Sequence, residues 1–124
     1  MPKVSKESAT QGGEFGPVTD RADQVGDYTV NFTSFREPVD GTPLLRGLVD
    51  DRCQCPHWGY VLSGRIAFVY AGGEEEFVAG DAFYTPPGHT PAHSADSEIL
   101  LFSPAAELAV TEEVMQRNMA AMSG

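Results

Sequence analysis

The chain has 124 residues, 41% of them hydrophobic, and a net charge of −10. This length supports one domain with one core, and the acidic surplus argues against binding to nucleic acid or a membrane surface, because nothing would neutralise phosphates. No apolar run approaches the roughly 20 residues that span a bilayer, and residues 1–8 lack the apolar stretch of a signal peptide. We therefore expect a cytoplasmic protein of bacterial type that binds neither nucleic acid nor membranes.

The predicted elements begin after a polar N-terminus. Residues 1–24 show little periodicity, so we expect a flexible or edge-covering arm. Short segments of alternating polarity follow, separated by glycine and proline turns, and these are typical of a sandwich or barrel. We predict an all-β barrel over residues 25–102 that can hold one small ligand. Its predicted strands are residues 27–35, 44–49, 53–62, 65–70, 74–79, 82–85 and 98–102.

A C-terminal helix is predicted over residues 103–124. Serine is a favoured N-cap and proline a favoured first helical residue, and the segment opens with Ser103-Pro104. We expect the helix to pack on the barrel or on a partner subunit rather than to contact a cofactor. Its apolar stripe consists of Leu108, Met115, Met119 and Met122.

Both cysteines and all three histidines lie between residues 53 and 93. Cys53, Cys55 and His57 share parity, so on an extended strand their side chains would point to one face. Zinc binds thiolate and imidazole tetrahedrally, whereas non-haem iron prefers two histidines and a carboxylate, which this sequence does not offer cleanly. We therefore favour zinc, with copper and nickel left open. The predicted ligands are Cys53, Cys55, His57 and His89.

Each candidate also has a purely structural interpretation. The cysteines could be buried hydrophobes or a strained disulfide, and His57 a hydrogen-bonded core residue. His89 could be a turn histidine, and His93 a residue of the surface or of a pocket rim. In the functional interpretation, His89 or His93 is the catalytic general base. If they face inward, an apolar lining is formed by Ile66, Phe68, Phe83 and Phe102.

From Cys53 to Phe102 the chain resembles the cupin superfamily. His57 lies seven residues before Gly64, where the first motif of that family has a glutamate. The second motif starts with Gly80, Pro86 and Gly88 in their expected places. The resemblance implies a double-stranded β-helix, also called a jelly-roll barrel.

The sequence departs from the family pattern at several ligand positions. No His-x-His is present, and counting back from His57 puts the first two ligand positions on Asp51 and Cys53, or on Asp50 and Arg52. Pro91 replaces the histidine of the second motif. The chain is most similar to cupins with Cys…His-x-Gly-Tyr-Val-Leu-x-Gly and Pro-Gly-His segments, a group of undefined function. Since cupins commonly pair through strand edges and terminal segments, the resemblance also implies a homodimer.

We therefore expect a small metal-binding cupin, with zinc favoured, that acts on a small molecule in the barrel. Lewis-acid or base chemistry of the isomerase, lyase or hydrolase type fits zinc better than dioxygenation. One alternative is a non-enzymatic module that binds a small ligand or a metal. Another is a metal-free pocket in which a buried base abstracts a proton.

Overall fold

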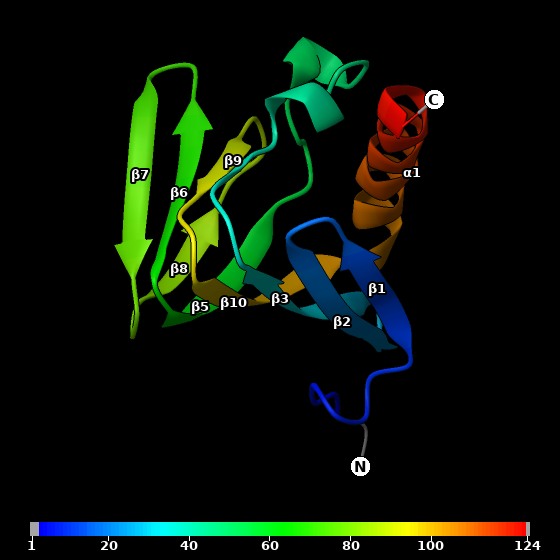
Figure 1. The fold of residues 1–124 in the computed structure, drawn as a ribbon, viewed down its shortest axis with the longest axis vertical. Coiled ribbons are helices and arrows are strands. Elements are labelled where there is room, and N and C mark those ends of the chain that lie inside the picture. Colours follow the sequence, from blue (N-terminus) through cyan, green and yellow to red (C-terminus); the bar gives the residue numbers. More distant parts are fainter. Residues whose placement is uncertain (1–2, 124) are drawn as a thin grey trace.

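The computed structural model describes residues 3–123, which form two antiparallel sheets and one α-helix (Figure 1). The strands are β1 (Gln11–Phe15), β2 (Val18–Val25), β3 (Tyr28–Phe35), β4 (Val39–Asp40), β5 (His57–Ser63), β6 (Arg65–Tyr70), β7 (Gly73–Val78), β8 (Ala82–Thr85), β9 (Thr90–His93) and β10 (Ser97–Pro104). Two short 3-10 helices, η1 (Thr42–Leu44) and η2 (Val49–Asp51), precede β5, and α1 (Ala105–Ser123) ends the chain.

The larger sheet has the strand order β1-β2-β3-β10-β5-β8 and the smaller one β4-β9-β6-β7. Figure 1 shows the β6–β7 hairpin and helix α1 on opposite sides of the molecule, with the strands of the larger sheet passing beneath both. The chain is thus all-β with a C-terminal helix, as predicted. In the described part of the chain, no helix is long and apolar enough to cross a membrane.

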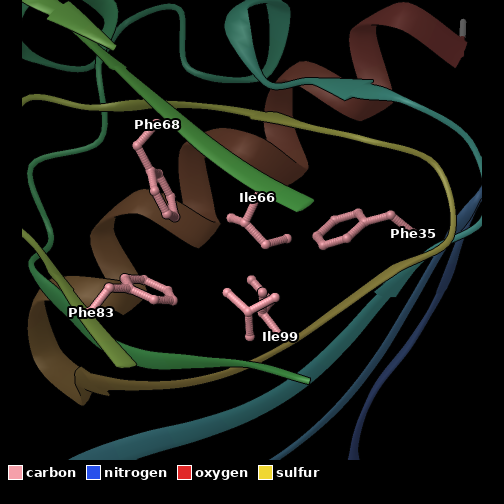
Figure 2. Packing of buried hydrophobic residues seen from close by; sticks show 6 residues of the cluster. Phe35, Ile66, Phe68, Phe83 and Ile99 are labelled. Atoms are coloured by element: carbon pink, nitrogen blue, oxygen red, sulfur yellow. The ribbon is translucent and has the colours of Figure 1, made fainter. Parts of the chain in front are cut away.

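The main core lies between the two sheets. Phe35 and Ile99 of the larger sheet meet Ile66 and Phe68 of the smaller one, and all point toward one another in Figure 2. The predicted lining is confirmed for Ile66, Phe68 and Phe83, which are buried. It is wrong for Phe102, whose side chain is 42% exposed. Inward and outward positions alternate along a strand, and Phe102 follows the inward position Leu101.

Residues 11–25 form a hairpin that the sequence did not suggest. β2 pairs along its whole length with β3, from Val18 opposite Phe35 to Val25 opposite Tyr28. β2 was not predicted because polar residues occupy most of its positions. Asp20 accepts hydrogen bonds from the side chains of Asn31 (3.1 Å) and Thr33 (2.9 Å). A hydrogen-bonded polar cluster here takes the place of the apolar alternation that marks most half-buried strands.

Of the two strands predicted between residues 44 and 62, one is absent and the other begins later than predicted. Residues 44–49 contain the end of η1 and the start of η2 rather than a strand. The predicted strand 53–62 begins only at His57, because Pro56 has no N–H to donate to a ladder. Cys53 instead forms an isolated bridge with His89. The short strands β4 and β9 were not predicted.

Helix α1 begins at Ala105, two residues later than predicted, because Ser103 and Pro104 still belong to β10. It contacts η1, β10 and β3. Leu108 and Met115 of the predicted stripe pack with Leu45, Cys53 and Cys55, whereas Met122 is largely exposed. Further along the helix, the Asn118 side chain donates hydrogen bonds to the carbonyls of Leu44 (2.7 Å) and Arg46 (2.9 Å). The helix is therefore fixed to the barrel and to the segment before β5 over most of its length.

A row of aromatic side chains is exposed on the outer face of the larger sheet. Trp58 lies 6.0 Å from Tyr28 and 5.1 Å from Tyr84 between ring centroids. Tyr60 and Phe102 are also exposed on this face. Exposed apolar patches often mark contact surfaces, and the homodimer stays a prediction.

Gly59 is expected to tolerate no side chain. A Cβ there would lie 2.5 Å from Cζ of Phe83 and 2.9 Å from the carbonyl oxygen of Leu100. Because this crowding lies against the core, Gly59→Ala should lower the free energy of unfolding by about 1–3 kcal/mol, measured by urea denaturation. Gly72→Ala is the matched control, since a Cβ there meets nothing within 4 Å. Equal stability of the two variants would contradict this packing.

Candidate metal centre

Three of the four predicted ligands come together inside the molecule. The ligand atoms of Cys53, His57 and His89 all lie within 4.8 Å of one another. Sγ of Cys53 lies 3.8 Å from Nε2 of His57, close to the roughly 3.5 Å that separates two ligand atoms of a tetrahedral zinc site. The three side chains are at most 6% exposed. We call Cys53, His57 and His89 the triad.

Backbone hydrogen bonds hold Cys53 beside His89. The N–H of Cys53 donates to the carbonyl of His89 (2.9 Å), and the carbonyl of Cys53 accepts from the N–H groups of Gly88 (2.8 Å) and His89 (3.2 Å). Gly88 has φ +94°, a conformation that glycine adopts without strain. The turn before His89 therefore brings the segment of the second predicted motif into direct contact with Cys53, which precedes His57 of the first.

The other ring nitrogens of the two triad histidines are also engaged. Nδ1 of His89 donates to the carbonyl of Pro86 (2.7 Å), which leaves Nε2 as the unprotonated nitrogen. Nδ1 of His57 hydrogen-bonds to Oγ of Ser103 (2.7 Å), while its Nε2 faces Cys53. Hydrogen bonds of this kind orient metal-binding histidines and fix their tautomers.

Cys55 lies apart from the triad. Its side chain is 1% exposed and belongs to the apolar cluster with Leu45 and Leu108. Its Sγ is 3.4 Å from the carbonyl of Pro56. Both cysteines are free thiols, so the disulfide alternative is not realised. The parity argument for Cys55 required an unbroken strand, and no such strand forms before His57. Its position matches the buried-hydrophobe alternative, and binding of a metal by Cys55 stays a prediction.

His93 is buried, which corrects the prediction of a surface or rim residue. Its ring packs against Phe35 (4.8 Å) and Phe68 (5.2 Å). Its Nδ1 accepts a hydrogen bond from the N–H of Ala67 (3.3 Å), so the proton of the neutral ring lies on Nε2. His93 is near the triad but not part of it, and its catalytic role stays a prediction.

Burial keeps the site uncharged at neutral pH. Desolvation, with a smaller contribution from the neighbouring histidines, lowers the pKa of His57 and of His93 to about 3. Burial also lowers the pKa of His89 and raises the pKa of the Cys53 thiol. The imidazoles are therefore ready to bind a metal, whereas the thiol must first lose its proton.

Two hydroxyl groups that contact the triad were not predicted from the sequence. Ser103, predicted as a helix cap, hydrogen-bonds to His57. Oγ1 of Thr111 lies 3.6 Å from Sγ of Cys53. Extending the last predicted strand by one residue would have placed Ser103 on the same inward face as Ile99. No sequence signal marks Thr111.

Loss of the Ser103 hydroxyl should weaken metal binding. If the triad binds zinc, Ser103→Ala is expected to raise the dissociation constant about 10- to 100-fold, because the His57 ring loses the bond that orients it. Competition with a chromophoric chelator measures this change. Ser63→Ala, at an exposed position on the same strand as His57, is the control. An unchanged constant in Ser103→Ala would argue against the orienting role.

Comparison with known proteins places the fold but not the activity. No family model and no curated protein matches the chain. Among solved structures, KdgF from Halomonas sp. is similar at 23% identity, with 82% of this chain and 90% of that chain covered and a TM-score of 0.56. A sugar phosphate isomerase of the cupin superfamily from Silicibacter pomeroyi is 18% identical, with 83% and 75% covered and a TM-score of 0.58. The polyketide cyclase RemF from Streptomyces resistomycificus is 18% identical, with 85% and 80% covered and a TM-score of 0.56.

These similarities, together with the two antiparallel sheets, show that the chain has the cupin jelly-roll fold. The fold that the resemblance implied is thus confirmed. Identities below 25% carry no information about substrate, so the chemistry has to be argued from the triad and its surroundings.

Proposed function

We propose that this chain is a small metal-binding cupin, with zinc favoured, that acts on an oxygen-bearing small molecule in the barrel. The observation that carries the proposal is the triad of Cys53, His57 and His89, whose buried ligand atoms converge within 4.8 Å. The hydrogen bonds of His57 and His89 to Ser103 and Pro86 support it, because they orient both rings.

The chemistry of the triad fits zinc better than iron. One thiolate and two imidazoles are borderline and soft donors, and three protein ligands leave a fourth tetrahedral position for water or substrate. The iron set of two histidines and a carboxylate is not formed, since the group of converging ligands in the described part of the chain contains no carboxylate. Copper and nickel remain alternatives that the donor types allow.

A bound zinc ion would supply a Lewis acid that polarises a carbonyl or hydroxyl oxygen. The residues around it would orient the substrate and exclude water. His93 was expected to be a base, but its Nδ1 is occupied by the N–H of Ala67, so its Nε2–H is placed to donate a hydrogen bond. We therefore assign His93 the role of a donor to the substrate and His89 that of a ligand.

Isomerase, lyase or hydrolase reactions of a small carbonyl compound suit such a centre. The names of two similar structures, a sugar phosphate isomerase and a polyketide cyclase, support a small-molecule reaction in this type of barrel. The near-complete burial of the triad favours a second candidate, a closed structural metal site without catalysis. A fourth ligand from solvent would favour the enzyme, whereas a fourth ligand from the protein would favour the structural site.

Metal content tests the proposal directly. The protein, purified without a histidine tag and without added metal, should contain about one zinc per chain by elemental analysis. Cys53→Ser should lose the metal, and Cys55→Ser should retain it, because Cys55 lies outside the triad. The two cysteines are equally buried, so each variant controls for the folding defect of the other. Absence of metal from the parent, with two titratable thiols, would leave a metal-free pocket with a buried base.

A further inference from the structure

Two buried hydroxyl groups near the triad lack a hydrogen-bond partner. In the described part of the chain, these orphaned side-chain atoms are Oη of Tyr70 and Oγ1 of Thr85. Thr85 is fully buried. Leaving a buried hydroxyl unpaired is costly, so such groups are uncommon and call for an explanation.

Both hydroxyls belong to the neighbourhood of the metal centre. Thr85 is the direct partner of His57 in the β5–β8 ladder, and the ring of Tyr70 packs against the ring of His89 at 6.4 Å. Against the burial that raises the pKa of Tyr70, the Thr85 side chain lowers it as a hydrogen-bond partner would, so the two hydroxyls lie close together, although neither forms a well-aligned hydrogen bond in the described part of the chain. The two hydroxyls thus come from strands of opposite sheets and approach each other beside the triad.

Tyr70 is a hydrogen-bond donor at neutral pH. Burial raises the pKa of Tyr70 above its ordinary value of 10.0, so the phenol keeps its proton. Its ring is only half-buried, which puts this side of the barrel within reach of solvent. Apolar rings pack beside the triad histidine that Tyr70 contacts, since Phe68 lies 5.3 Å from His89 and 5.7 Å from Phe83 between ring centroids.

We propose that the hydroxyls of Tyr70 and Thr85 bind a second oxygen of the substrate, and that the substrate is a small uncharged compound with two neighbouring oxygens, such as a hydroxyketone. The inference rests on the proposed function, because the first oxygen is the one at the triad. The buried polar groups of the described residues include histidine, hydroxyl and amide side chains but no lysine or arginine. An uncharged ligand therefore suits this lining better than a carboxylate or phosphate, whose charge would be left unpaired. The aromatic rings pack against its carbon atoms.

Ligand-observed NMR titration of the zinc-loaded protein tests the inference, with hydroxyacetone as the probe and acetone as its one-oxygen control. The parent should bind hydroxyacetone about 25-fold more tightly than acetone, since each of the two satisfied hydroxyls contributes about a factor of five. The double variant Tyr70→Phe/Thr85→Val should lose this preference while its zinc content stays that of the parent. Absence of the preference in the parent, or its persistence in the double variant, would overturn the inference.

Thermal unfolding separates a ligand-binding hydroxyl from a structural one. Because the Thr85 hydroxyl forms no well-aligned hydrogen bond in the described part of the chain, Thr85→Val in the absence of ligand should keep or raise the thermal midpoint, by up to about 4 °C. A clearly lower midpoint would assign the hydroxyl a structural role and overturn the inference. If the parent contains no zinc, the proposed function fails. The hydroxyl pair is then judged separately, by whether the double variant lowers the affinity of the metal-free chain for hydroxyacetone.

Discussion

Replacement of His57 by alanine is expected to remove zinc from the protein and to abolish any stabilisation by added zinc. Nε2 of His57 lies 3.8 Å from Sγ of Cys53 and is one of three converging ligands, so its loss leaves too few protein ligands for a stable site. A metal present at about 1,000 times its dissociation constant stabilises the folded state by about 4 kcal/mol. Elemental analysis, with thermal unfolding with and without a chelator, measures both effects.

His93→Gln is the matched control for this experiment. His93 is as deeply buried as His57 and lies in the same barrel, but it is not among the three converging ligands. The His93→Gln variant should therefore bind as much zinc as the parent, although its free energy of unfolding will be lower. If His57→Ala also retains zinc, the assignment of the ligand is wrong. If His57→Ala unfolds and the parent never contained metal, His57 is a core histidine held by Ser103.

The barrel was predictable where the apolar residues follow the strand period. The predicted bounds of β3, β6 and β8 agree with the structure to within one residue. Burial alternates strictly along β8, whereas β6 buries three consecutive residues, Ile66 to Phe68. β2 escaped prediction because Asp20 faces its polar partners Asn31 and Thr33. β9 escaped it because its four residues include Pro91 and no apolar run. The local pattern of apolar residues therefore identifies strands that bury apolar side chains. It does not identify strands whose inward side chains are polar and hydrogen-bond to one another.

The site was predictable in its residue types but not in its geometry. The window 53–93 contained all the soft ligands, yet parity placed Cys55 with Cys53 and His57. In the structure, Cys53 joins His89 through backbone hydrogen bonds across more than thirty intervening residues, and such a long-range bridge has no local signature. The same limit applies to Ser103, Thr111 and Thr85, whose contacts depend on which strands become neighbours.

Acid should destabilise the metal-free protein well above the pH at which its carboxylates are protonated. The pKa of both His57 and His93 is lowered in the fold from 6.5 to about 3. Between these values the unfolded chain binds two protons that the folded chain does not, so stability is lost as the pH falls below about 6.5 and is fully present above it. His89, whose pKa burial also lowers, acts in the same direction.

The size of this effect can be set against the stability of a small domain. Each histidine that stays neutral in the fold removes about 1.4 kcal/mol per pH unit below 6.5, so two of them remove about 4 kcal/mol between pH 7 and pH 5. Small domains are stable by only about 5–15 kcal/mol, so the metal-free chain should lose a large share of its stability by pH 5. Urea denaturation at both pH values, with a chelator present, measures the loss. His93→Gln should lose clearly less than the parent over this range, about half to two-thirds as much, because one of the contributing histidines is gone and His57 and His89 remain. An equal loss in parent and variant would show that His93 is not held neutral by the fold, and that other groups destabilise the protein in acid.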